Sequence, residues 1–214
     1  MVLLANGAEC SLRTGDWAWA LAELDTALAD DLEASDRAAL INAVVALRAP
    51  RGEAVAALVD EVTRLVGSST ESQLLASLEG ARASAAFGSG RIADALGTWG
   101  RLAEVSAEYL PVTLARAARA ALWLGDATAA ATDLVALGAW RDLGLLWDEA
   151  LAGIDMATLL DPADPDVRAA ADRSREILVG LGATPFIARL DAALAAGPHA
   201  DTTTQAPSGD RARV

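Results

Sequence analysis

Few residues of this 214-residue chain have side chains suited to catalysis or metal binding. His199 is the only histidine, and it stands in a polar segment near the C-terminus, where partner groups are rarely held in place. Cys10 is the only cysteine, and its apolar neighbours predict a small buried hydrophobe rather than a reactive thiol. One cysteine and one histidine are too few for a zinc site. A single cysteine also excludes an intrachain disulfide, which is typical of a reducing, cytoplasmic location.

Two acidic clusters are the remaining candidates for metal chemistry. Residues 30–33 begin like a magnesium-binding aspartate motif, but Ala34 stands where a further carboxylate is needed. Residues 161–166 lack the spacing and the glycine of an EF-hand loop. Helix ends and N-caps explain both clusters, because carboxylates stabilise the first turn of a helix. We therefore expect no metal and no other cofactor.

Catalytic motifs are also missing from the sequence. It contains no Gly-x-Ser-x-Gly nucleophile elbow, and no Ser/His/Asp set can be assembled. A phosphate-binding loop of the Gly-Lys-Ser/Thr type is impossible, because all 17 basic residues are arginine. The acidic and basic residues are not clustered as an active site requires. The sequence therefore predicts a protein that is not an enzyme.

The net charge of −13 restricts the partners. Nucleic-acid binding requires clustered cationic side chains, and an anionic membrane surface repels an acidic protein. No uncharged stretch approaches the roughly 18 apolar residues of a membrane span. We predict no nucleic acid and no membrane among the partners, and we expect a basic or neutral protein or peptide.

The elements that must position these residues are helices. Alanine, the best helix former, makes up about a quarter of the chain, and no long segment alternates like a strand. Asp16, Thr70 with Gln73, and Asp164 with Pro165 are predicted helix N-termini. About eleven helices are expected, among them residues 16–29, 35–49, 52–66, 71–87, 141–159, 165–179 and 184–196, one starting at Arg91, and one from Pro111 to Gly125.

The C-terminal segment differs in composition from the rest. Residues 197–214 carry too little apolar material to order themselves. We therefore assign residues 1–196 to one helical domain and residues 197–214 to a disordered tail.

Four turns recur at a nearly constant spacing. They are centred on Gly15, Gly52, Gly90 and Gly125, which are 37, 38 and 35 residues apart. Alanine follows each glycine after five residues, at positions 20, 57, 95 and 130, and a small or β-branched residue precedes each by seven, at positions 8, 45, 83 and 118. Two antiparallel helices approach closely only where small side chains face each other, so this pattern predicts repeated helix pairs.

This pattern resembles the tetratricopeptide repeat over residues 3–137. The first unit carries the resemblance best, and its matching residues are Ala8, Gly15, Asp16, Trp17, Ala20, Leu24 and Ala27. The second unit departs most, because Val45 and Glu61 stand at the small and bulky positions. The resemblance implies an all-α, right-handed solenoid of about five antiparallel helix pairs with a C-terminal capping helix.

Residues 171–190 are similar to the closing repeat of large bacterial signalling ATPases, which link an ATPase module to a cyclase or helix-turn-helix effector. This second resemblance implies that the chain is the regulatory or sensor repeat region of such a protein.

In tetratricopeptide domains the first helix of each pair lines a concave groove, and the resemblance places candidate partner-binding residues there. They are Glu9, Arg13, Asn42, Phe87, Arg119 and Trp123. Arg119 beside Trp123 would suit a peptide carboxylate or an aromatic anchor. The alternative is a solvated arginine and a packed tryptophan, and most other tryptophans are expected to fill space between helices.

We therefore predict a non-catalytic scaffold that binds a protein or peptide. The alternatives are a small-molecule-sensing helical domain and a homo-oligomerisation module, since exposed end repeats can bury apolar surface on a second copy.

Overall fold

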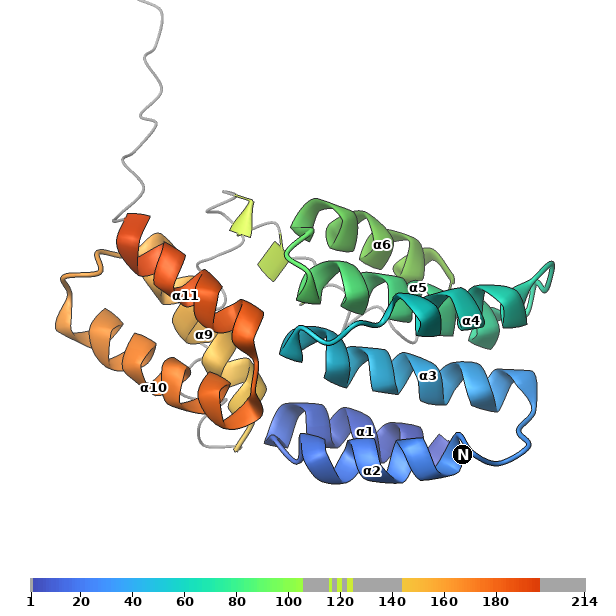
Figure 1. The fold of residues 1–214 in the computed structure, drawn as a ribbon. Coiled ribbons are helices and arrows are strands. Elements are labelled where there is room, and N and C mark those ends of the chain that lie inside the picture. The colour runs from blue at the N-terminus through green and yellow to red at the C-terminus, as the bar shows by residue number, and fades with distance from the viewer. Residues whose placement is uncertain (1, 106–115, 117–118, 121–122, 125–143, 197–214) are drawn as a thin grey trace, which may run out of the picture.

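The computed structural model describes residues 2–105, 116, 119–120, 123–124 and 144–196. In this part of the chain every regular element is a helix, which confirms the all-α prediction. The α-helices, labelled in Figure 1, and the one-turn helix η1 are α1 (Val2–Thr14), α2 (Trp17–Ala27), α3 (Ala34–Arg48), η1 (Ala49–Arg51), α4 (Ala56–Val66), α5 (Ser72–Gly88), α6 (Ile92–Val105), α9 (Leu146–Leu159), α10 (Pro165–Leu181) and α11 (Thr184–Ala196). The predicted tail at 197–214, which includes His199, lies outside the described residues. The same holds for most of the helix predicted between Pro111 and Gly125, of which only positions 116, 119–120 and 123–124 are described.

The first six helices form three successive hairpins, α1 with α2, α3 with α4 and α5 with α6. The predicted turn glycines stand between the partners, with φ of +97° at Gly15, +78° at Gly52 and +77° at Gly90. Side chains with a Cβ rarely adopt this left-handed backbone, so glycine stands in the turn between the two helices of each hairpin. The structure therefore confirms the predicted turns at these three glycines, while the predicted turn at Gly125 lies outside the described residues.

The predicted helix contacts hold in the first and third hairpins. Ala8, Ala20, Ala83 and Ala95 are all at most 2% exposed. In the second hairpin the prediction for Ala57 is wrong, because that side chain is exposed. The one-turn helix η1 and the residues that follow it delay the start of α4 to Ala56, so Ala57 falls in the first turn of the helix, on the surface.

Two further local predictions are wrong. Glu71, not Thr70, takes the N-cap position of α5 and makes no side-chain cap; its backbone N–H donates instead to the Ser69 hydroxyl, 3.1 Å away. Cys10 is exposed, because it lies on the face of α1 that turns away from the buried positions Ala8 and Leu12.

The C-terminal helices follow their predicted signals more closely. Asp164 caps α10 by accepting the Asp166 N–H at 2.8 Å, with Pro165 as the first helical residue. The helix runs through Gly180 and ends at Leu181, two residues later than predicted. In α9 the predicted start at 141 is wrong, because Gly144, at a φ of +69°, forms a turn and the helix begins at Leu146.

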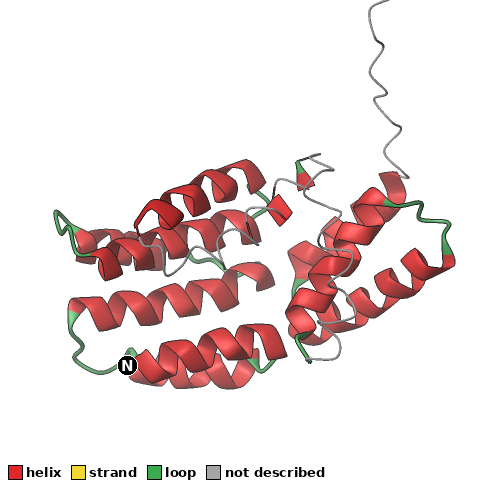
Figure 2. Cartoon of the chain, turned by 180° about the vertical axis from the view of Figure 1, so that it is seen from behind, coloured by secondary structure: helices red, strands yellow, loops and turns green. Residues whose placement is uncertain are grey.

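The largest part of the core joins α9–α11 to the first three helices. Trp17 on α2 and Trp147 on α9 meet edge to face with ring centroids 5.2 Å apart. Leu146 and Leu181 pack over the turn at Gly15, where a Cβ would come within 3.1 Å of the Leu146 Cδ1 atom. In a linear repeat array each unit touches only its neighbours. Here α9 contacts α1, so the chain folds back onto its first hairpin, as both ribbon views show (Figures 1 and 2).

Two smaller core clusters hold the other hairpins together. One joins α3, α4 and α5 around Ile41, Val62 and Leu78. The other joins α5 and α6 around Ala83, Ala95 and Trp99. Among the described helices none combines the length and the apolar character needed to cross a membrane.

Candidate functional site

Two of the predicted groove residues meet on one buried carboxylate. The Arg119 Nε atom donates to Asp155 Oδ2 at 2.9 Å, and the indole N–H of Trp123 donates to Asp155 Oδ1. Asp155, on α9, is 1% exposed, and Arg119 is 7% exposed. A buried charge is tolerated only when it is paired and hydrogen-bonded, and both conditions hold here.

An aromatic ring and a guanidinium group both pack on the Trp123 ring. Phe87 of α5 stacks on its ring with a centroid separation of 5.1 Å and an angle of 10° between the planes. The Arg189 guanidinium of α11 lies 4.0 Å from the ring centroid, which is cation–π geometry. Burial lowers the pKa of Arg189 from its ordinary value, and the Asp155 carboxylate acts in the opposite direction. We call Arg119, Trp123, Asp155 and Arg189 the Asp155 cluster.

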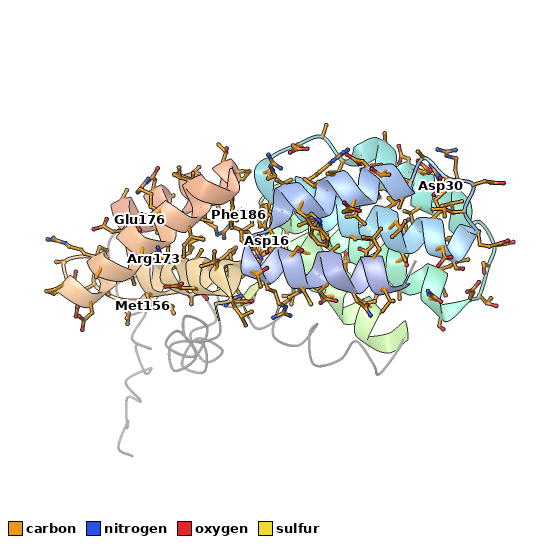
Figure 3. All side chains as sticks on the ribbon, turned by 90° about the horizontal axis from the view of Figure 1, so that it is seen from below. Asp16, Asp30, Met156, Arg173, Glu176 and Phe186 are labelled. Carbon is orange, nitrogen blue, oxygen red and sulfur yellow. The ribbon has the colours of Figure 1, made fainter. Side chains whose placement is uncertain are left out.

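Six of the nine aromatic residues form one continuous series of ring contacts that includes this cluster. Phe186 is central to it, with centroids 4.9 Å from Trp147 and 5.4 Å from Phe87. Figure 3 labels Phe186 where the C-terminal helices meet the first helices. The rings are Trp17, Trp147, Phe186, Phe87, Trp99 and Trp123. This confirms the packing role predicted for Trp17, Trp99 and Trp147.

The other predicted groove residues lie at the edge of this region or apart from it. Arg13 forms an ion pair with Asp148 of α9 at 3.3 Å, and Glu9 lies 4.0 Å from an Arg116 nitrogen. Both pairs are partly exposed and tie α1 to later parts of the chain. Asn42 is separate from them, because it packs over Gly80 between α3 and α5, where a Cβ would come within 2.8 Å of its Oδ1 atom.

The structure therefore brings Phe87, Arg119 and Trp123 together through internal contacts. A partner that bound Arg119 would have to draw it from Asp155 and leave a buried carboxylate without that guanidinium, which is costly. The geometry favours an internal cluster in which Arg119 and Trp123 connect α5, α9 and α11.

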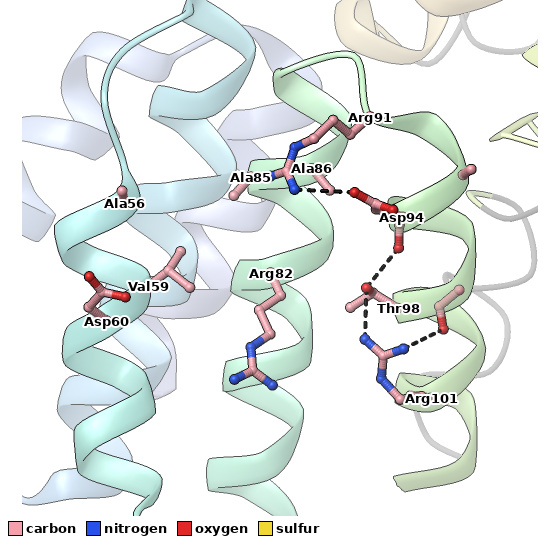
Figure 4. A pocket seen from close by; sticks show the side chains of 12 residues that line it. Ala56, Val59, Asp60, Arg82, Ala85, Ala86, Arg91, Asp94, Thr98 and Arg101 are labelled. Atoms are coloured by element: carbon pink, nitrogen blue, oxygen red, sulfur yellow. Dashed lines mark hydrogen bonds and ion pairs between the residues drawn. The ribbon is translucent and has the colours of Figure 1, made fainter.

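A second candidate site was not found from the sequence. It is a hollow of about 610 Å³ between α4, α5 and α6, within the roughly 300–1,000 Å³ that ligand pockets occupy. Figure 4 shows Arg82, Arg91 and Arg101 around it, with Asp60 on α4 and Asp94 on α6. We call this site the arginine hollow.

One carboxylate, that of Glu79 on α5, forms ion pairs with two arginines of the arginine hollow. Glu79, whose side chain is 12% exposed, accepts from Arg82 at 3.0 Å and from Arg101 at 2.8 Å, one on each oxygen. Arg101 also donates to the Thr98 hydroxyl at 3.0 Å. Arg91 pairs with Asp94 on the open side at 3.2 Å. The two guanidinium groups on Glu79 are thus held in place while remaining accessible to water.

The sequence holds only a partial signal for this site. Asp94, Thr98 and Arg101 have the i, i+4, i+7 spacing of one helix face, which predicts a polar stripe on α6. Nothing in the local pattern indicates that Arg82 and Glu79, on the preceding helix, face that stripe. Their meeting depends on how α5 packs against α6.

The acidic clusters contain no metal-binding arrangement within the part of the chain that is described. In the second cluster the Asp161 and Asp164 carboxylates accept backbone N–H groups two residues ahead, at 2.8 Å, which confirms the predicted capping role. Glu33, at the N-cap position of α3, makes no such side-chain bond.

No protein-family model matches the chain, and comparisons with curated proteins and with solved structures also give no match.

Proposed function

We propose that the chain is a non-catalytic helical scaffold that binds another protein through its first hairpin. The observation that supports this proposal is the exposure of a large apolar side chain on each of its two helices, α1 and α2; we call Trp19, Gly7 and Leu3 the Trp19 patch. Trp19 is 53% exposed and Leu3 is 88% exposed. The Trp19 ring lies over Gly7, 3.9 Å from where a Cβ would stand, so Trp19 and Gly7 share one surface of the hairpin.

Such a patch has the features of a docking site. Tryptophan is strongly enriched among the residues that dominate binding energy at interfaces. Glu23, which is exposed, stands four residues after Trp19 on the same helix, and the neighbouring Asp25 is paired with Arg48 at 2.7 Å. An apolar anchor with acidic residues on its helix suits a basic or neutral protein partner, in agreement with the net charge of −13.

The wider proposal includes the architecture that the sequence predicts. The three hairpins would belong to a tetratricopeptide-like solenoid of about five pairs, acting in the cytoplasm as the regulatory or sensor region of a bacterial signalling ATPase. The return of α9 to α1 would make that solenoid closed rather than linear.

Photo-crosslinking in cells tests the docking surface. A photoreactive phenylalanine analogue is placed at Trp19 in one variant and at Val179, an exposed apolar residue of α10, in a matched control. We expect one defined protein crosslinked from position 19 and not from position 179. Equal crosslinking at both positions, or none at position 19, would contradict the proposal.

A second copy of the chain is the alternative occupant of the same patch. Light scattering of the purified chain measures its oligomeric state directly. A dimer that the Trp19→Ser substitution converts to a monomer would replace the scaffold by the homo-oligomerisation module.

Small-molecule sensing is the second candidate function, and the arginine hollow is the observation that favours it. Its size is that of a ligand pocket, and two of its three arginines are held in place by the Glu79 carboxylate.

A further inference from the structure

Two arginine side chains of the arginine hollow already share one carboxylate. Arg82 donates to one oxygen of Glu79 at 3.0 Å, and Arg101 donates to the other at 2.8 Å. Two guanidinium groups that hold the two oxygens of one carboxylate are close neighbours, so a second carboxylate on their open side can contact both. That side faces water, because the Glu79 side chain is 12% exposed while those of Arg82 and Arg101 are 41% and 56% exposed.

Both arginines retain N–H donors for a ligand. A guanidinium group has five donors in a planar fork that fits a carboxylate. Among the described residues, Arg82 donates only to Glu79. Arg101 also donates to the Thr98 hydroxyl and the Gly97 carbonyl oxygen, which fix the direction of its side chain. Most donors of Arg82 and some of those of Arg101 therefore remain for a ligand at a site that is already ordered.

The charge at this site favours a ligand with a single negative charge. Glu79 neutralises one of the two guanidinium groups, which leaves one positive charge in excess. Asp60 of α4 lines the same hollow and adds a negative charge to it. A ligand with two negative charges would exceed the charge that Arg82 and Arg101 offer and would be repelled by Asp60.

A short apolar strip lies beside the two arginines, within the α5–α6 hairpin. Ala85 and Ala86 line the hollow three and four positions after Arg82, one turn further along α5. Gly97 lines it four positions before Arg101 on α6. Both directions lead toward the turn between the two helices (Figure 4). One helical turn is about 5.4 Å long, which is the length of a chain of about four carbon atoms.

A charged pair ends this strip near the turn. Arg91 pairs with Asp94 at 3.2 Å, and both side chains are more than half exposed. Their charges balance each other, so this pair offers neither an excess charge nor an apolar wall. On α4, the hollow is lined by Ala56 and Val59, and none of its described lining residues is aromatic. The apolar part of a ligand would therefore be short and aliphatic.

We infer that the arginine hollow binds a small aliphatic monocarboxylate of about five carbon atoms. Its carboxylate bridges Arg82 and Arg101, and its chain lies on Ala85, Ala86 and Gly97. This inference rests on the second candidate function, small-molecule sensing, and it names the ligand class of that site. It does not depend on the Trp19 patch, which lies on another hairpin.

Nuclear magnetic resonance titration of the full chain tests the ligand class. The probes are acetate, propanoate, pentanoate and octanoate, with pentanamide as the uncharged control and glutarate and inorganic phosphate as the controls with further negative charge. We expect affinity to rise at least about twofold per carbon from acetate to pentanoate, because each methylene covers apolar surface, and to change less than about twofold from pentanoate to octanoate. Pentanamide should bind at least about tenfold more weakly than pentanoate, because it lacks the charge.

The controls separate this inference from the function on which it rests. Tighter binding of glutarate or phosphate than of pentanoate would overturn the ligand class and leave small-molecule sensing in place. Equal binding of pentanamide and pentanoate would overturn the role of the carboxylate. No binding of any probe would overturn both the inference and the sensing role of the hollow.

Two glycines of α6 locate the site. Neither Gly97 nor Gly100 has a neighbour within 4 Å of a Cβ, so both accept a larger side chain without a clash, but only Gly97 lines the hollow. We expect Gly97→Leu to weaken pentanoate binding at least about tenfold and Gly100→Leu to leave it within about twofold of wild type, with both variants fully helical by circular dichroism. Equal binding by the two variants would overturn the assignment to the hollow.

Arginine variants locate the carboxylate. We expect Arg82→Gln and Arg101→Gln each to weaken pentanoate binding at least about fivefold, because each removes one charged donor. Arg91→Gln, in the hollow but paired with Asp94, and Arg168→Gln, on an exposed site of α10, should leave it within about twofold. An equal loss in Arg91→Gln, or no loss in Arg82→Gln and Arg101→Gln, would overturn the proposed contact.

Discussion

The Asp155 cluster and the arginine hollow contain the same two groups, guanidinium and carboxylate, in different surroundings. Asp155 is 1% exposed and is held between Arg119 and Trp123. In the hollow the Arg82 and Arg101 side chains are 41% and 56% exposed. Charges that are removed from water must be satisfied by the protein itself, while charges that water can reach remain available to a ligand.

The two regions are therefore expected to respond differently to substitution, one through folding stability and the other through ligand binding. Within the Asp155 cluster, loss of one partner leaves a desolvated charge, so substitutions there should lower stability. In the arginine hollow, water replaces a lost partner, so substitutions there should alter ligand binding with a small effect on folding. Isosteric substitutions in the two regions measure this difference directly.

The largest effect is expected for Asp155→Asn. The amide preserves the shape but removes the negative charge between Arg119 and Trp123. We expect the free energy of unfolding to fall by about 3 kcal/mol, as for other broken buried ion pairs. Chemical denaturation measured by circular dichroism gives this value. The exposed substitution Asp172→Asn is the control, and a loss below about 1 kcal/mol for Asp155→Asn would contradict the buried role.

The next effect is expected for Gly153→Ala, in the helix that carries Asp155. A Cβ at Gly153 would lie 1.9 Å from the Ser174 Oγ atom and 2.9 Å from the Ala170 carbonyl oxygen. Helices α9 and α10 must therefore separate, and we expect a loss of about 2 kcal/mol. Thermal unfolding detects it. If the double variant Gly153→Ala with Ser174→Ala were no more stable than Gly153→Ala alone, the Ser174 contact would not be the cause.

A smaller loss is expected for Glu79→Gln, the matching substitution under the arginine hollow. Arg82 and Arg101 lose their shared carboxylate but can turn toward water, so the expected loss is about 1 kcal/mol. Denaturation alongside Asp155→Asn provides the comparison. Equal losses for the two variants would remove the distinction between the regions.

The smallest effect has the opposite sign. Gly97→Ala places a methyl group in open space inside a helix, and alanine favours the helix over glycine. We expect a gain of about 0.7 kcal/mol in the free energy of unfolding. A loss would show that the hollow is more tightly packed than its geometry indicates.

The local features of the fold were predictable from the sequence. The turns at Gly15, Gly52 and Gly90 and the cap at Asp164 follow from short-range backbone chemistry, and the structure confirms them. The prediction for Ala57 failed because α4 begins at Ala56, four residues later than predicted, which places Ala57 in the exposed first turn. The prediction for Cys10 failed because its position on α1 faces away from the buried residues Ala8 and Leu12.

The candidate sites were less predictable. The sequence placed Phe87, Arg119 and Trp123 among six groove residues. Arg119 and Trp123 meet on Asp155, which no local pattern connects to them, and Phe87 stacks on the Trp123 ring. The arginine hollow was missed because its charged residues lie on α4, α5 and α6, and no local pattern shows which faces of these helices meet.

The sequence by itself determined that this protein is built of helices, where most of them turn, and that it carries a net charge of −13. Helix propensity, capping and glycine backbone freedom act within a few residues, so they can be read along the chain. Only the tertiary structure decided that Arg13 reaches Asp148, 135 positions away, and that α9 returns to α1. Such contacts depend on the summed packing of all the helices, and that packing decides which arginines are enclosed and which remain open to a ligand.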